Sequence, residues 1–189
     1  MNYSPVDFSP LLGLSGFSDN LLNNHFALYQ GYVKNVNKMA ELSEKAESGS
    51  PEYAELKRRF GWEYNGMVLH ELYFGNLTKN ASPLSGDGDL KKKIIERFGS
   101  FEAFEKDFRA TGAMRGIGWV ILYYYKEDGR LFNVWINEHD VGHLAGAKPL
   151  LVMDVFEHSF MLDYGLNRAG YIDAFMKAIN WAEVNRRMT

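Results

Sequence analysis

The stretch LLVMDVFEHSF, residues 150–160, places acidic and imidazole side chains directly after a run of residues suited to burial. Asp154 and His158 stand four residues apart, and Glu157 lies between them. Burying a charged group is costly, so charges in protein interiors are normally paired or bound to a metal. The stretch therefore predicts either a buried salt-bridge cluster or part of a metal site, where a strand passes into a helix.

The composition limits the chemistry open to this chain. Its 189 residues, 46% of them hydrophobic, are enough for a substantial core in one large or two small domains. The net charge of -3 gives no reason to expect nucleic acid or an acidic membrane as a partner. The chain has no cysteine, which excludes disulfides, thiolate catalysis and Cys-based zinc or iron–sulfur sites. Any metal must therefore be held by His, Asp, Glu and water.

The N-terminal part of the chain is predicted to form a helical hairpin. Residues 1–18 contain two prolines and two glycines and are expected to form an extended arm. A first helix begins near Asn20, and a second spans residues 52–78, with the polar break ESGSP between them. One face of the first helix carries Leu22, His25, Tyr29, Tyr32 and Val36, and one face of the second carries Gly66, Met67, His70, Tyr73, Phe74 and Leu77. Two long helices with a short break predict an antiparallel pair.

After a polar linker at residues 78–89, the pattern predicts a mixed domain. Two short helices, 89–98 and 101–114, precede the β-rich segments 119–125 and 131–137, which KEDGR joins as a hairpin. A third strand is expected at 148–154, and helices at 157–164 and 168–186. The predicted fold class is α+β, with an N-terminal antiparallel α-hairpin domain at 1–80 and a C-terminal α+β domain at 88–189 that contains a small antiparallel sheet.

The histidines provide the main functional signal. His25, His70 and His158 are predicted to face inward, and Asp154 ends a buried strand. A single histidine on an apolar face is more often a hydrogen-bonded core residue than a ligand. Three of them with a buried aspartate form a His₃Asp set, which suits a first-row transition metal.

Several motifs resemble the iron/manganese superoxide dismutases. The C-terminal segment from Leu150 to Arg187 resembles that family's D-x-W-E-H, N-x-R-x-x-Y and N-W pattern without a gap. Upstream, HELYFGNL (70–77), FGSFEAFEKDF (98–108) and GIGW (116–119) resemble further family motifs in the same order. The resemblance covers roughly residues 20–187. It implies a helical hairpin followed by an α+β domain with a three-stranded antiparallel sheet.

The resemblance implies four metal ligands: His25, His70, Asp154 and His158. An ungapped alignment on Tyr32 would instead put Asn24 at the first ligand position, so a shifted register stays open there. His25 is the choice here because Asn is a poor ligand for this chemistry. The cofactor implied is one iron or manganese ion per subunit, with iron slightly favoured.

The resemblance also implies roles for residues around the metal. Tyr32 is expected to guard the substrate channel, and His139 to stand beside the metal, since Gly66 offers no side chain there. The alternative for His139 is an exposed loop histidine. Glu157, Tyr29 and Arg168 are expected at the interface or around the ligands. Glu157 would reach the partner subunit's ligand histidine, and Arg168 would attract the superoxide anion. His143 matches no family role and is expected to be a loop residue.

The function implied is that of an antioxidant enzyme, a superoxide dismutase that converts superoxide to dioxygen and hydrogen peroxide by redox cycling of its metal. A homodimer, possibly paired into a tetramer, is expected, in the cytoplasm because no targeting segment is visible. The departures from the family pattern are Leu69, Ile121, Phe156, Met161, and Leu28 or Tyr29. Because they lie at the expected channel wall, they leave an alternative open: a weakly active or non-enzymatic metal-binding protein on the same scaffold.

Overall fold

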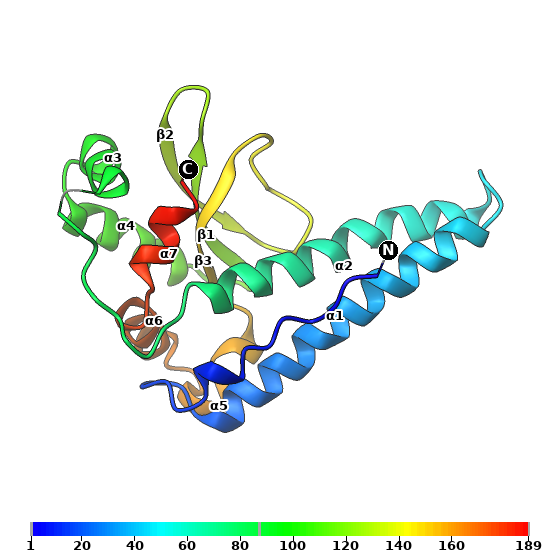
Figure 1. Ribbon diagram of the computed structural model, residues 1–189, viewed down its shortest axis with the longest axis horizontal. Coiled ribbons are helices and arrows are strands. Elements are labelled where there is room, and N and C mark those ends of the chain that lie inside the picture. The colour runs from blue at the N-terminus through cyan, green and yellow to red at the C-terminus, as the bar shows by residue number, and fades with distance from the viewer. Residues whose placement is uncertain (1, 87, 189) are drawn as a thin grey trace.

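Two long helices form the N-terminal half of the chain. The computed structural model describes residues 2–86 and 88–188. After an arm that contains the short 3-10 helix η1 (Ser9–Leu11), helices α1 (Asp19–Lys45) and α2 (Pro51–Gly75) run side by side as an antiparallel hairpin (Figure 1). Ser18 and Ser50 cap their first turns by accepting hydrogen bonds from backbone N–H groups. The predicted helical hairpin is confirmed.

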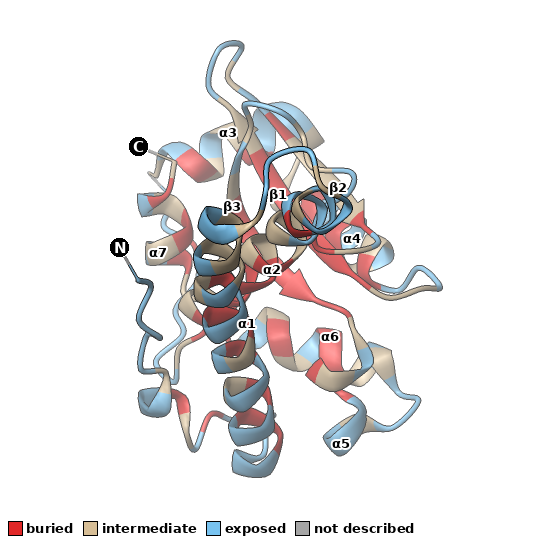
Figure 2. Cartoon of the chain, turned by 90° about the vertical axis from the view of Figure 1, so that its right-hand side faces the viewer, coloured by how far each residue is buried: buried red, intermediate tan, exposed pale blue. Residues whose placement is uncertain are grey.

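The facing sides of α1 and α2 bury the residues that the helical periodicity selected. All members of both predicted stripes are buried, including His25 and Tyr32 on α1 and His70 on α2. Figure 2 shows this division along α1, with buried positions on one side and exposed positions on the other. The 3.6-residue period of the apolar positions therefore brings two histidines to the same internal seam.

The C-terminal half combines a small sheet with short helices. Helices α3 (Asp89–Phe98) and α4 (Phe101–Gly112) pack on strands β1 (Trp119–Tyr125) and β2 (Arg130–Ile136). Strand β3 (Lys148–Asp154) pairs with the other edge of β1, which gives an antiparallel sheet in the order β2-β1-β3. The predicted α+β class and the three strands are confirmed.

The strand register gathers functional residues at one end of this sheet. Trp119, the first residue of β1, pairs with Ile136 at the end of β2 and with Asp154 at the end of β3. Gly118 precedes Trp119 with φ +128°, and a Cβ there would lie 1.8 Å from the carbonyl oxygen of Ile136. Only glycine fits this close approach. The chain thus brings Asp154, Trp119 and the segment after β2 to one place.

The C-terminal helices differ from the prediction in two ways. Residues 157–164 form the 3-10 helix η2 (Glu157–Ser159) and then one turn, α5 (Met161–Tyr164), and not a single helix. Residues 168–186 form two helices, α6 (Arg168–Lys177) and α7 (Trp181–Arg186). The break has a tertiary cause: Ile179 makes a β-bridge with Leu77, and Asn180 donates its backbone N–H to the carbonyl of Asn76. The helix periodicity of the sequence carries no trace of these contacts.

A buried polar clamp joins the two halves. Asn76, at the end of α2, donates to the carbonyl of Val152 in β3 and accepts from the guanidinium of Arg187. Arg187 also donates to the carbonyls of Leu150 and Leu72.

The predicted domain boundary near residues 80–88 stays a prediction. Asp87, within the predicted linker, lies outside the described residues, as do Met1 and Thr189 at the ends of the two predicted domain ranges.

No described helix is both long enough and apolar enough to cross a membrane.

Candidate metal centre

Four elements place one potential ligand each around a common point. His25 comes from the second turn of α1, His70 from α2, Asp154 from the end of β3 and His158 from η2. One ligand atom from each residue lies within 4.8 Å of the others. The carboxylate oxygen Oδ2 of Asp154 is 3.2 Å from Nε2 of His25, 3.6 Å from Nε2 of His70 and 3.0 Å from Nε2 of His158. Sequence positions more than 120 residues apart therefore converge on one oxygen atom.

The ring nitrogens of two histidines face this point without a hydrogen bond. Nε2 of His25 and Nε2 of His70 are buried and have no hydrogen-bond partner among the described residues, although Asp154 is near. The Nδ1 of His70 lies 2.6 Å from the carbonyl oxygen of Gly66. Because a carbonyl can only accept, Nδ1 carries the proton and Nε2 presents its lone pair. This tautomer is the one a metal ligand requires, and the carbonyl fixes the orientation of the ring.

The electrostatics of the cluster also suit a cation. Burial lowers the pKa of His25 and holds that of His70 well below its ordinary value, so both rings are neutral near pH 7. Burial alone would raise the pKa of Asp154, but His158 and His25 outweigh it and hold that carboxylate ionised. Burial alone would lower the pKa of His158, but the charge of Asp154 and its hydrogen bond outweigh burial, so the pKa of His158 is raised. A metal cation would take the place of the proton between Asp154 and His158.

The first helix presents His25, and not Asn24, to this cluster. His25 is buried with its ring 5.0 Å from that of His70 and 4.9 Å from that of His158. Asn24 is exposed and its amide bonds to Asn20 in the preceding turn. Helix α1 is continuous α-helix from Asp19 to Lys45. His25 and Tyr32 are seven residues apart, close to two full turns, so they share a face without any change of pitch.

Tyr32 and His139 form a hydrogen-bonded pair beside the four residues. The Tyr32 hydroxyl lies 2.7 Å from Nε2 of His139, and its ring stacks on His70 at 5.1 Å. The indole N–H of Trp119 donates to Nδ1 of His139 over 3.0 Å. Neutral His139 therefore carries its proton on Nε2 and donates it to the Tyr32 oxygen. Burial lowers the pKa of His139 to about 4 and raises that of Tyr32, so both groups are neutral near pH 7.

Two side chains near His139 were not predicted. His143 was expected to be a simple loop residue, but it lies between the hydroxyl of Tyr123, 2.6 Å from Nδ1, and the carbonyl oxygen of His139, 2.7 Å from Nε2. Trp62 covers the pair from the side of α2, with its ring 4.6 Å from that of His139. The spacing of four residues between His139 and His143 was the only signal for the first, and nothing in the sequence marked the second.

The other predicted site residues lie further from the cluster. Tyr29 donates to Glu71 and accepts from the backbone N–H of Val6, which ties the N-terminal arm to the hairpin. Glu157 is exposed next to His158. Arg168 donates to two backbone carbonyls in the segment that follows α4.

The departures from the family pattern lie in three kinds of place: at the site, in the core and on the surface. Phe156 stacks on His158 at 5.4 Å and packs against His139 at 5.0 Å, so an aromatic ring still lines the site there. Leu69 and Ile121 are buried in the core, whereas Met161 and Leu28 are exposed.

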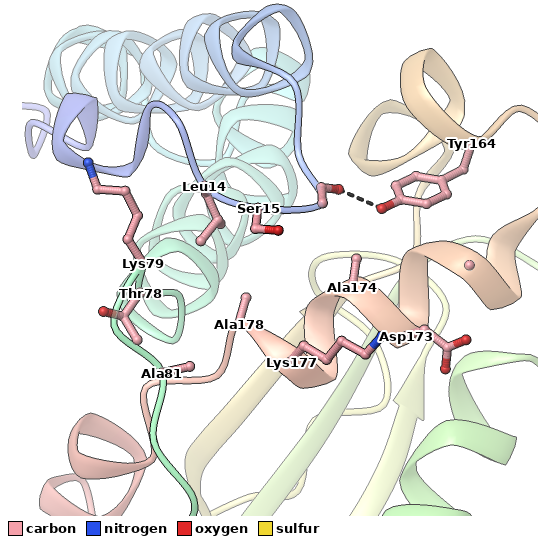
Figure 3. A pocket seen from close by; sticks show the side chains of 12 residues that line it. Leu14, Ser15, Thr78, Lys79, Ala81, Tyr164, Asp173, Ala174, Lys177 and Ala178 are labelled. Carbon is pink, nitrogen blue, oxygen red and sulfur yellow. Dashed lines mark hydrogen bonds between the residues drawn. The ribbon is translucent and has the colours of Figure 1, made fainter.

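A separate pocket of about 470 Å³ lies between the arm, the segment after α2 and helix α6 (Figure 3). Its lining includes Lys79, Lys177 and Asp173, together with small residues of α6, and contains none of the residues of the cluster or of the Tyr32–His139 pair. In Figure 3 the amino group of Lys79 points away from that of Lys177, so the two cations do not converge on one ligand.

Three imidazoles and one carboxylate form a ligand set for iron, manganese or a similar transition metal.

A family model for the C-terminal domain of iron/manganese superoxide dismutases matches residues 86–187. The chain is 40% identical to a superoxide dismutase [Fe] from Cupriavidus metallidurans, over 92% of this chain and 89% of that protein. It is also 40% identical to a superoxide dismutase [Fe] from Aquifex pyrophilus (97% and 89%) and 37% identical to superoxide dismutase [Mn] 2 from Haloferax volcanii (85% and 80%). Motifs, fold and relatives agree, and the chain belongs to the iron/manganese superoxide dismutase family.

Proposed function

We propose that this protein is a superoxide dismutase whose iron or manganese ion is held by His25, His70, Asp154 and His158. The observation that carries the proposal is the convergence of these four ligand atoms beside the Tyr32–His139 pair. These four residues would hold the ion, and the ion would supply the one-electron redox chemistry that the dismutation of superoxide requires. Overall, two superoxide anions and two protons give one dioxygen and one hydrogen peroxide.

The residues around the ligands hold and deliver protons. Since Trp119 donates to Nδ1 of His139, the single proton of His139 sits on Nε2 and points at the Tyr32 oxygen. The hydroxyl proton of Tyr32 is then free to point toward the substrate side. The raised pKa of Tyr32 keeps that proton in place at neutral pH until the peroxide product draws it.

Iron is the slightly favoured metal. Helix α2 offers only Gly66 one turn before His70, and the polar group beside the site is supplied by His139 from the segment after β2. Two of the relatives named above are called iron enzymes and one a manganese enzyme. Hydrogen bonds around a metal tune its redox potential, so Tyr32 and His139 are the residues expected to decide which metal is active.

A matched pair of variants tests the ligand assignment. His25→Ala removes a buried proposed ligand, and Asn24→Ala changes the neighbouring exposed residue. Iron and manganese per subunit are measured after purification and reloading, together with superoxide decay. We expect the first variant to lose most bound metal and activity, and the second to match the parent protein. Full metal occupancy with no superoxide decay in the parent protein would favour the non-enzymatic alternative.

We further propose that the protein is a homodimer in which Glu157 contacts the partner subunit's His158. The side chain of His158 is 31% exposed, and its Nδ1 makes no hydrogen bond to any described residue. Exposed apolar side chains gather in the same segment: Met161, Leu162 and Leu166. Sedimentation of Glu157→Ala against the parent protein tests this. Dissociation of the variant is expected, and a parent protein that stays monomeric at high concentration would exclude the dimer.

A further inference from the structure

The outer side of the Tyr32–His139 pair is covered by one indole. The ring of Trp62 lies 5.5 Å from that of Tyr32 and 4.6 Å from that of His139. Its N–H donates to the carboxylate of Glu138, the residue before His139, over 3.2 Å. Trp62 is only half-buried, so it stands between the pair and solvent on this side.

Arg59 lies against this indole. Its guanidinium carbon is 4.1 Å from the centre of the Trp62 ring, a cation–π contact. Nε of Arg59 donates to Glu63 over 2.9 Å, and the other oxygen of Glu63 accepts from Asn35 of α1. Glu63 is 2% exposed, whereas the side chain of Arg59 is 50% exposed. The guanidinium is therefore fixed on its inner side and open to solvent on its outer side.

The charges nearest this end of the site are mixed. Burial, Asp154, Glu63 and Glu138 all raise the pKa of Tyr32, and the positive charge of Arg59 opposes them. Two carboxylates, from α2 and from the segment after β2, thus act on the tyrosine together with one guanidinium. Superoxide is an anion and would be repelled by those carboxylates if they were not compensated.

We propose that Arg59 is a steering residue, which offsets one of the two negative charges of Glu63 and Glu138 and so reduces the repulsion of the superoxide anion at the Tyr32–His139 end of the site. This inference rests on the proposed function. Arginine suits the position better than lysine because its planar guanidinium can stack on Trp62 and bond to Glu63 at the same time. Arg168, which the sequence suggested for attracting the anion, donates hydrogen bonds to two backbone carbonyls instead.

The test compares four variants: two lower the net charge by one at neighbouring positions, and two leave the net charge unchanged. Arg59→Gln removes the proposed steering charge. Arg58→Gln removes the neighbouring arginine, which is 72% exposed and bonds only to Glu55 among the described contacts. Arg59→Lys keeps the charge without the stacked plane, and the double variant Arg59→Gln/Glu63→Gln removes a cation and an anion together. Thermal unfolding confirms that each variant is folded.

Two rates are measured on metal-loaded protein over ionic strengths from about 10 mM to about 0.5 M, a range that covers strong and weak screening. One is the second-order rate of superoxide decay after pulse radiolysis. The other is the association rate of azide by stopped-flow spectroscopy. Azide carries the same charge as superoxide and reports anion entry without turnover, so a failure of the proposed function remains distinguishable from a failure of steering.

We expect Arg59→Gln to lower both rates about twofold at low ionic strength, the effect of one charge at a distance on the order of 10 Å in water. The difference from the parent protein should vanish at high ionic strength. Arg58→Gln should match the parent, and Arg59→Lys and the double variant should each fall between Arg59→Gln and the parent. The proposal is overturned if Arg59→Gln matches Arg58→Gln at every ionic strength, or if its loss does not shrink with salt.

Discussion

Gly66→Ala places a methyl group where the structure has no room for one. A Cβ at Gly66 would lie 2.6 Å from Cδ1 and 2.7 Å from Cε1 of the Tyr32 ring. The ring cannot simply withdraw, because it stacks on His70, packs against Trp62 and holds His139 through its hydroxyl. We therefore expect the substitution to displace Tyr32 from its position beside the four proposed ligands.

Two opposing energies decide the effect on stability. Alanine is favoured over glycine in a helix by about 1 kcal/mol. Forcing an extra carbon into a packed interior costs about 1–3 kcal/mol. Gly61→Ala, in the same helix, gains the helix preference without the packing cost, because no atom beyond the adjoining residues and helix backbone lies within 4 Å of its Cβ position. The helix preference cancels between the two variants, so Gly66→Ala should be less stable than Gly61→Ala by about 1–3 kcal/mol.

Urea denaturation at equal metal content measures this difference, and superoxide decay measures the functional effect. Displacing a proton-donating group by about 1 Å can lower a rate by about 100-fold, so Gly66→Ala should lose much of its activity while Gly61→Ala keeps it. The reasoning is refuted if Gly66→Ala is as stable and as active as Gly61→Ala, since Tyr32 would then move at no cost.

Two further predictions concern the clamp and the pair. Asn76→Ala removes a buried partner of Arg187 and should destabilise the protein by about 2–4 kcal/mol in urea denaturation. Asn80→Ala, at an exposed position, should have little effect. Equal stability of the two variants would contradict the role of Asn76 in the clamp. The pKa of His139 is about 4 in the folded chain and about 6.5 in the unfolded chain. Between these two pH values the unfolded chain binds a proton at His139 that the folded chain does not bind. His139 therefore lowers the free energy of unfolding as the pH falls from about 6.5 to about 4. On going from pH 7 to pH 4.5, the free energy of unfolding of His139→Gln should rise by about 1–2 kcal/mol relative to that of the parent, after allowance for solvent screening. A difference between the two proteins that does not change with pH would exclude a depressed pKa for His139.

Local patterns in the sequence were sufficient for most of the fold. The apolar stripes of α1 and α2 and the β-branched runs of the sheet each repeat with the period of their element, so they could be recognised without tertiary contacts. The break between α6 and α7 could not, because it depends on the bridge from Ile179 to Leu77, about 100 residues away. Local propensity for helix continues through that point.

The candidate site was predictable where a motif carried it. Asp154 and His158 share one short stretch, and His70 lies within a recognisable motif. His25 was preferred to Asn24 because of its ligand chemistry, and the structure adds the direction of each side chain on α1. The contacts of Trp62 and His143 with His139 depend on how the segment after β2 folds back on α2. No spacing in the sequence determines that path.

The most direct test of the central claim is superoxide decay measured by pulse radiolysis on protein loaded with iron alone, manganese alone or neither, with metal content determined on the same samples. We expect decay at a rate proportional to the bound metal in at least one loaded form, and none above background in metal-free protein or in Asp154→Ala, which should bind little metal. Negligible decay at full occupancy with either metal would contradict the claim that these residues form a dismutase site.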